Sequence, residues 1–373
     1  MKSQQSTEKT VTPDIQEIRA RLLQELPKEA RMANQKRMLW ALPLGLSVLV
    51  GWWAILGPLE TWWAKLIAAV IIAHSLGALI FLGHEVMHGA MGGSRKLQNA
   101  IGWLGFGPIL VPPDFWRAWH NRMHHGNTNH KVNDPDHFGT LGRYKRPSLA
   151  KKLLAFSPGT GHPLSYLFCC YNFTLHSNVT LWTIADRHPI LKGKSWTKEK
   201  VQTVVLAFAW LVFALLSGWD FIYTVVLPLA GANFMTQIYI VTNHALRPLT
   251  RENNPLENSM SLTVPEWVDK LHFRFSHHTE HHILPAMASD QLPKLRAWLD
   301  SEYPGQLARM SHPEAVSWLY NTPRTYRTPT TLASLDNPDR VFDLVAFGDY
   351  IKSERKDRER PGADTFWRDA STL

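Results

Sequence analysis

Four long apolar segments limit the folds open to this chain of 373 residues more than any other feature. They cover residues 39–57, 61–83, 201–217 and 221–243. As helices, segments of this length cross roughly 30 Å of hydrocarbon. Lys65 is the only Lys or Arg within the two segment pairs and their connecting turns. The sequence therefore predicts an all-α integral membrane protein with four transmembrane helices in two hairpins, and disfavours four core helices of a soluble protein.

Charge placement predicts the side of the membrane on which each segment lies. The short turns inside the two hairpins, at residues 58–60 and 218–220, carry no Lys or Arg, residues that cytoplasmic loops collect. We therefore expect the N-terminus, the middle segment and the C-terminal region in the cytoplasm. The membrane is a bacterial inner membrane or, for a eukaryotic source, the endoplasmic reticulum. The net charge of +9 indicates a basic face near anionic lipid, and without a nucleic-acid-binding motif it predicts no nucleic-acid partner.

The expected domain organisation places a membrane domain between two polar ends. The C-terminal end is rich in Pro, Thr and charge, which is typical of a solvated tail. Residues 165–185 either lie along the interface as an amphipathic helix or form a weak span, and the interfacial position keeps the charge topology intact. The expected divisions are a polar N-terminal helix or arm (1–38), a membrane domain (39–320) with a cytoplasmic helical cap (84–200 and 244–320), and a polar C-terminal tail (321–373).

Three clusters contain most of the 18 histidines. The first lies where the second span ends, the second lies in the middle segment, and the third follows the fourth span. The predicted topology therefore brings all three to one face of the membrane. Helix positions i and i+3 or i+4 share a face, so the histidines of each cluster can point into one space. The pairs and triplet expected to do so are His84/His88, His120/His124 and His278/His281/His282.

Eight or more neutral imidazoles exceed the three or four protein ligands of a tetrahedral zinc ion. Two metal ions fit better, although imidazole suits iron, copper and zinc alike. A single histidine outside the clusters is usually a surface or capping residue, which is our expectation for His162, His188 and His312. No role follows from the sequence for His74, His137, His176 or His272.

The first cluster also reads His-Glu-Val-Met-His, the H-E-x-x-H pattern of zinc metalloproteases, in which the glutamate is the general base. A membrane zinc protease would leave the other two clusters without a role. A metal transporter would need ionisable residues along the spans, where only Lys65 and His74 are available. Both stay remote alternatives. In a dimetal centre we expect Glu85 to orient a ligand imidazole, and Asp134, Asp136 and Glu280 either to do the same or to be solvated charges.

The chain resembles the membrane fatty acid desaturase superfamily of non-haem di-iron enzymes, whose signature is three histidine boxes. Here the boxes read HEVMH, HNRMHH and HTEHH, and the similarity covers about residues 80–290. The family also places a ligand at the cytoplasmic end of its last span, where His244 lies; Asn243 beside it can hold a water. The metal ligands that the resemblance implies are His84, His88, His120, His124, His125, His244, His278, His281 and His282.

The resemblance implies two non-haem iron ions with O2 as co-substrate, and no catalytic residues beyond the metal ligands. The expected reaction is desaturation of a fatty acyl chain, carried as an acyl lipid or an acyl thioester, in a channel between the hairpins. The sequence has neither a His-Pro-Gly-Gly haem motif nor an iron-sulfur cysteine set. A separate ferredoxin or haem protein is therefore the expected electron donor. Related di-iron lipid hydroxylases and carotenoid- or sphingolipid-modifying oxygenases are the alternative.

Overall fold

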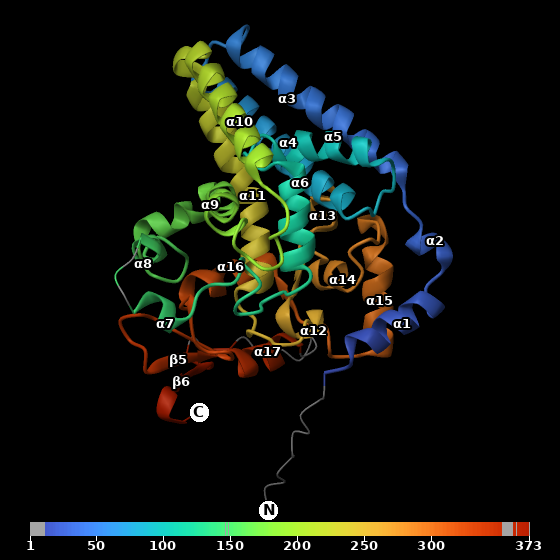
Figure 1. The fold of residues 1–373 in the computed structure, drawn as a ribbon, viewed down its shortest axis with the longest axis vertical. Helices are drawn as coiled ribbons and strands as arrows, with labels where there is room; N and C mark the ends of the chain where they lie inside the picture. The colour runs from blue at the N-terminus through green and yellow to red at the C-terminus, as the bar shows by residue number, and fades with distance from the viewer. Residues whose placement is uncertain (1–11, 146, 148, 353–360, 363, 373) are drawn as a thin grey trace, which may run out of the picture.

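Long helices dominate the computed structural model, which describes residues 12–145, 147, 149–352, 361–362 and 364–372. Figure 1 shows the longest helices together at one end of the molecule, whereas shorter helices and the strands gather at the other end. The mostly helical architecture that the sequence predicts is confirmed.

Four helical segments are long and apolar enough to cross a membrane, and each overlaps one of the four predicted spans to within one residue at the ends where the span extends further. Helix α4 extends to Met87 and so includes His84, the start of the first histidine box. The segments are Gln35–Leu56 (η1, Gln35–Trp40, and α3, Ala41–Leu56), Trp62–Met87 (α4), Thr197–Leu216 (α10) and Gly218–His244 (η5, Gly218–Asp220; η6, Ile222–Val226; α11, Leu227–His244).

The helices α4 and α11 form the inner pair of the four. They pack against each other, and α3 packs on the other side of α4. Small residues allow a close approach: a Cβ added at Gly231 of α11 would lie 2.7 Å from the Cβ of Ala73 on α4. In contrast, α3 and α10 expose most of their apolar side chains. The inner pair therefore fixes the positions of His84 and His244 at its ends.

Two short helices lie against this inner pair. The helix α5 (Arg95–Phe106) packs against α4, and α9 (Phe168–Val179) packs against α11 before continuing into the π-helical turn η4 (Thr180–Ile184). The helical run η3 (Pro163–Leu167), α9 and η4 is continuous over residues 163–184, but it is not among the four segments of the described chain that are apolar enough to cross a membrane. Of the two alternatives for residues 165–185, the structure therefore favours the interfacial helix.

The C-terminal region differs from the predicted polar tail of an all-α protein. Strands β3 (Thr325–Thr328), β4 (Thr331–Ala333), β5 (Arg340–Asp343) and β6 (Trp367–Asp369) form an antiparallel sheet in that order. Its apolar side chains, including Phe342, are fully buried in a core shared with Leu246 after α11. The prediction was wrong because strands of three or four residues leave little periodicity in a sequence rich in Thr and charge. Most of the charged segment near the end, 353–360, lies outside the described residues.

The N-terminal region forms the expected helix, α1 (Ile15–Glu25), which packs on the part of the chain around the third histidine box. Its apolar face, including Ile18 and Leu22, is buried against α15 (Leu292–Glu302). Arg19 on the same helix donates hydrogen bonds to the backbone carbonyls of His282 and Ile283. The N-terminal helix therefore supports the backbone of the third histidine box.

The remaining elements connect these parts. A further two-stranded parallel sheet pairs β1 (Ser261–Thr263) with β2 (Arg309–Ser311). The other helices are α2 (Lys28–Arg31), α6 (Pro113–Trp116), η2 (Arg117–His124), α7 (Leu141–Tyr144), α8 (Leu149–Leu154), η3 (Pro163–Leu167), α12 (Pro255–Asn258), α13 (Glu266–Leu271), α14 (His278–Ile283), η7 (Ser289–Gln291), α16 (His312–Asn321), α17 (Leu344–Lys352) and η8 (Ala370–Thr372).

Candidate metal centre

Four separate parts of the chain bring histidines to one place. The end of α4 carries the first box, the π-helix η2 and the residue after it carry the second, α11 ends at His244, and α14 carries the third box. The nine residues form two groups, within each of which one ring nitrogen per residue lies within 4.8 Å of the others. The groups are His84, His88, His120, His125 and His281 (the five-histidine group) and His124, His244, His278 and His282 (the four-histidine group). The structure therefore brings together all nine histidines proposed from the sequence.

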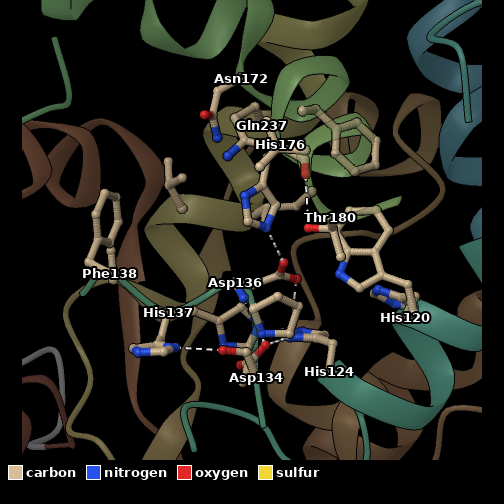
Figure 2. Close-up of a pocket in the computed structure, with 18 of the residues that line it drawn as sticks. His120, His124, Asp134, Asp136, His137, Phe138, Asn172, His176, Thr180 and Gln237 are labelled. Carbon is tan, nitrogen blue, oxygen red and sulfur yellow. Dashed lines mark hydrogen bonds and ion pairs between the residues drawn. The ribbon is translucent and has the colours of Figure 1, made fainter. Parts of the chain in front are cut away.

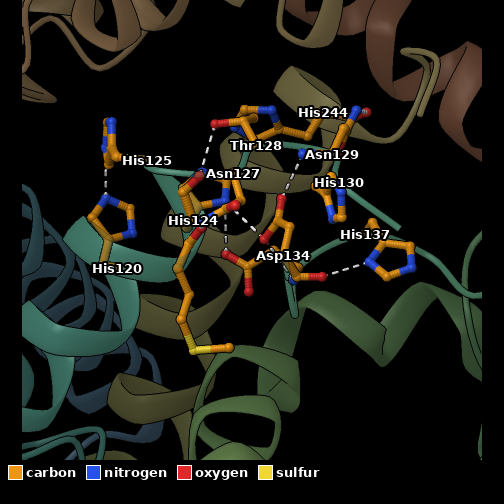
Figure 3. Close-up of polar contacts among 12 residues, drawn as sticks. His120, His124, His125, Asn127, Thr128, Asn129, His130, Asp134, His137 and His244 are labelled. Carbon is orange, nitrogen blue, oxygen red and sulfur yellow. Dashed lines mark hydrogen bonds and ion pairs between the residues drawn. The ribbon is translucent and has the colours of Figure 1, made fainter. Parts of the chain in front are cut away.

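The helix that carries the second box does not have the geometry that we assumed. The residues Arg117–His124 form a π-helix, in which the His125 N–H donates to the His120 carbonyl, five residues earlier. This winding puts His120 and His125 side by side, with 3.1 Å between their Nε2 atoms. His124 belongs to the four-histidine group, and it also forms a smaller set with His120 and Asp136, whose possible ligand atoms likewise lie within 4.8 Å of one another. The prediction that His120 and His124 can point into one space is therefore compatible with the structure, although the π-helix also brings His125 beside His120. Figure 3 shows His120 facing His125, with His124 on the other side.

The third box is divided in a similar way between the two groups. Its α-helical turn sends His278 and His282 to the four-histidine group, with 3.1 Å between their Nε2 atoms. His281 points to the five-histidine group instead, 3.2 Å from the Nε2 of His125. Two pairs of consecutive residues, at 124–125 and 281–282, therefore each contribute to both groups.

The electrostatics of the two groups suit metal ions. Burial lowers the pKa of His88, His120, His125 and His282 well below the usual value and that of His281 to about 3, which keeps these rings neutral. Neutral imidazoles are the form that binds metals. The Nε2 atoms of His244 and His278 face each other at 2.7 Å, and Nε2 of the buried His88 has no partner. Within each group, the facing ring nitrogens of neutral imidazoles cannot all be paired by N–H donors. A bound cation would accept their lone pairs, so each group fits a metal ion.

Hydrogen bonds on the outer ring nitrogens hold several of these histidines in place. Nδ1 of His124 lies 3.2 Å from Oδ1 of Asp134 and 3.3 Å from Oδ2 of Asp136. Nδ1 of His244 lies 3.2 Å from the carbonyl oxygen of Asn258, and Nδ1 of His282 lies 3.2 Å from Oγ1 of Thr128. Such contacts fix the ring orientation and leave Nε2 for the metal. Of the two alternatives for Asp134 and Asp136, the structure favours orienting a ligand over a solvated charge.

Burial alone would lower the pKa of His124, but Asp134 and Asp136 outweigh it and raise that pKa. His124 thus differs in its surroundings, because two carboxylates share its outer nitrogen. Figure 3 shows Asp134 between His124 and the backbone of Asn129. The N–H of Asn129 donates to Oδ2 of Asp134 at 2.7 Å, and this contact holds the carboxylate itself in place.

Glu85 does not have the role that we expected. Its carboxylate accepts hydrogen bonds from the N–H and Oγ of Ser289, at 2.8 and 2.6 Å, and from Nη2 of Arg37 at 2.9 Å. It therefore ties α4 to the loop after the third box instead of orienting an imidazole. Glu280 likewise pairs with Arg296 and Ser261, away from the nine histidines.

Histidines outside the nine have other partners. His277 lies against Asp269 and Glu280, which agrees with its exclusion from the third box. His162 and His188 accept hydrogen bonds from nearby backbone N–H groups, as expected of capping residues. His312 is half-buried and packs on the ring of Tyr239, with 4.5 Å between the ring centroids, so it is not the exposed surface residue that was expected. Both side-chain polar atoms of the fully buried Asn243 lack a partner, which fits the expectation that it holds a water.

A cavity of about 380 Å³ reaches both groups of histidines. Its walls are mostly apolar, from Phe106, Trp116, Trp119 and Phe173 among others, and it touches His120 and His124. Figure 2 shows Asn172, His176 and Gln237 around the cavity and Asp136 between His176 and His124. Sequence reasoning missed these lining residues because no short motif marks a wall built from four distant segments. The size lies within the range of about 300–1,000 Å³ typical of small-molecule sites.

Comparison with known proteins identifies the family. A sequence profile described as fatty acid desaturase matches residues 60–314, more than half of the chain. The chain belongs to the fatty acid desaturase family. The matched region contains all nine histidines, so the two groups lie in the part of this desaturase that its family shares.

Named relatives agree with this assignment. This desaturase is 24% identical over 302 residues to an sn-1 oleoyl-lipid 12-desaturase of Anabaena variabilis, covering 73% of this chain and 78% of the relative. It is 31% identical over 156 residues to an sn-1 acyl-lipid omega-3 desaturase (ferredoxin) of a Synechocystis strain, covering 41% and 42%. A chloroplastic omega-6 fatty acid desaturase of Spinacia oleracea is 24% identical over 251 residues, covering 62% and 52%. The chain is thus a fatty acid desaturase, an oxidoreductase with histidine clusters suited to metals and four apolar helices suited to a membrane.

Proposed function

We propose that this enzyme desaturates the acyl chain of a membrane lipid, using O2 and two non-haem iron ions held by the nine histidines. One observation carries the proposal: two groups of buried and half-buried imidazoles border an apolar cavity of about 380 Å³. Bound iron would supply the oxidant that removes hydrogen from an unactivated methylene. Acyl lipids are the substrates printed in the names of two relatives, which supports the choice of a lipid over a thioester.

The residues of the chain position the substrate. Aromatic and aliphatic walls hold the acyl chain without polar partners and exclude water from the site. Histidines of both groups line the cavity, so the acyl chain would pass along both groups. These histidines are His84, His120, His124, His244 and His278. No acid or base beyond the ligands is needed, since Glu85 is engaged by Ser289 and Arg37 and does not line this cavity.

The remaining parts of the proposal concern the surroundings of the site. We propose that α3 with α4, and α10 with α11, cross the bilayer as two hairpins, with the histidines on the cytoplasmic side. Two relatives, acyl-lipid omega-3 desaturases of a Synechocystis and a Nostoc strain, carry ferredoxin in their names, which supports a separate ferredoxin-like donor that docks on that side. The positive net charge of +9 suits an acidic donor protein.

The test is expression in a host that lacks desaturases, followed by mass spectrometry of the host lipids and metal analysis of the purified protein. We expect new double bonds in lipid acyl chains and close to two irons per chain. His124→Ala and His281→Ala, one from each group, should abolish the product, whereas His162→Ala should keep it. Hydroxylated lipids or carotenoid products without new double bonds would show that the enzyme catalyses one of the alternative reactions. One bound zinc without iron would favour the protease alternative.

A further inference from the structure

The outward face of α9 and of the short helix before it, η3, is apolar and exposed. Leu164, Leu167, Leu175 and Trp182 lie at helical spacing and are between 39% and 53% exposed. Residues 163–184 contain no Asp, Glu, Lys or Arg. A water-soluble surface rarely carries a row of this kind, so the face needs a partner.

The position of α9 indicates that its partner is lipid. The opposite side of α9 packs against α11, which belongs to a segment able to cross a membrane, and Figure 1 shows the two helices side by side. Exposed basic residues stand on both flanks, including Lys152 before α9 and Arg187 and Lys192 after it. Apolar faces with basic flanks are typical of helices that lie in the membrane interface. The exposed face of α9 therefore continues the lipid-facing surface of the spans.

The cavity opens at this same face. Tyr171, Leu175 and Val179 are each at least 37% exposed, and all three line the cavity. The neighbouring side of α9 lines the interior with Asn172 and His176, as Figure 2 shows. One helix thus presents a continuous surface from the outside of the protein to the site beside His124.

Basic side chains stand where the cavity meets the surface. Lys131 and Arg143 line the cavity and are exposed. The acidic lining residues, Asp134 and Asp136, lie at the inner end in contact with His124. The outer end therefore favours an anionic group and the inner end an uncharged chain.

We propose that the acyl chain enters the cavity sideways from the bilayer over α9, while the phosphate of its lipid lies against Lys131 and Arg143. This inference rests on the proposed desaturase function and adds the route and the headgroup chemistry. An acyl chain on this route never crosses water, whereas a soluble thioester would have to deliver its chain from the aqueous side. The substrate is accordingly a phospholipid of the same membrane.

The test uses the full-length protein in vesicles of phosphatidylglycerol with an electron donor system. Leu175→Arg places a charge at the cavity entrance, and Leu167→Arg places the same charge on the same face away from the cavity. We expect kcat/KM for vesicle lipid to fall at least tenfold in Leu175→Arg and no more than about twofold in Leu167→Arg. Equal losses in the two variants, or none in either, would refute the route.

A second measurement does not depend on turnover. Phosphatidylglycerol with a photoreactive diazirine near its ester should cross-link to residues 163–184 in the wild type and much less in Leu175→Arg. Cross-links confined to other segments would overturn the proposal, as would desaturation of soluble acyl-CoA or acyl-carrier protein in preference to vesicle lipid. Failure of the wild type to desaturate any substrate would instead refute the proposed function, while the cross-link still reports the route.

Discussion

Replacing Asp134 by Asn should weaken one of the two metal groups selectively. Asp134 is 1% exposed, and its Oδ1 accepts from His124 Nδ1 and from the Asp136 N–H, while its Oδ2 accepts from the Asn129 N–H. Asn keeps one acceptor oxygen, so its amide nitrogen must face a donor that then has no partner. The unpaired donor should cost about 1–3 kcal/mol of unfolding free energy.

The metal affinity should change as well, because the carboxylate orients His124. Loss of such an outer contact typically weakens metal binding about 10- to 100-fold, or about 1.4–2.7 kcal/mol. Of the two large groups, His124 is a member of the four-histidine group. Titration of the iron-loaded variant with a chelator, followed by iron analysis, should therefore release one iron per chain early and the second at the wild-type concentration.

Asp269→Asn is the matched control. Asp269 is also a buried carboxylate, 4% exposed, and contacts a histidine outside the nine, His277, at 3.4 Å. This variant should lose stability and keep both irons at wild-type affinity. Release of both irons together from Asp134→Asn, or wild-type retention of both, would refute the assignment of His124 and the role given to Asp134.

Two further predictions follow from residues outside the metal groups. Glu85→Gln should keep activity within about threefold of the wild type, because Glu85 has a structural role. Glu85→Ala leaves Arg37 partly unpaired and should lower the free energy of unfolding by about 3–5 kcal/mol, measured by titration with a denaturing detergent. A complete loss of activity in a folded Glu85→Gln enzyme would revive the general-base role. Phe342→Ala should cost about 3–5 kcal/mol because Phe342 is fully buried between the C-terminal sheet and the core; an unchanged unfolding midpoint would show that the sheet is not docked.

The sequence was informative where the signal is long or repeated. Four apolar segments of about 20 residues leave few alternatives to membrane helices, and the ends of the second and fourth bring His84 and His244 to one level. The three boxes and the family resemblance indicated eight of the nine histidines, and the position at the end of the fourth span indicated His244. Both signals can be read from the sequence alone, because neither depends on which segments contact each other in the fold.

The sequence was uninformative where the answer depends on local winding or distant partners. The pairing of His120 with His125 depends on a π-helix, whereas the spacing rule assumed an α-helix. The role of Glu85 depends on Ser289, 204 positions later in the chain. The same limitation hid the C-terminal sheet, whose short strands are stabilised by burial against α11 and its neighbours.

The two pairs of consecutive histidines have a consequence for how this enzyme can diversify. Backbone links at 124–125 and 281–282 couple the two groups through bonds that neither stretch nor rotate freely, with neighbouring Cα atoms about 3.8 Å apart. A substitution elsewhere cannot easily change the spacing of the pair of sites, and an inserted residue in either turn would disrupt both at once. Evolution of a new product should therefore keep these two turns unchanged and alter the cavity wall. There, single side chains determine which carbon of the substrate lies beside the two groups of histidines.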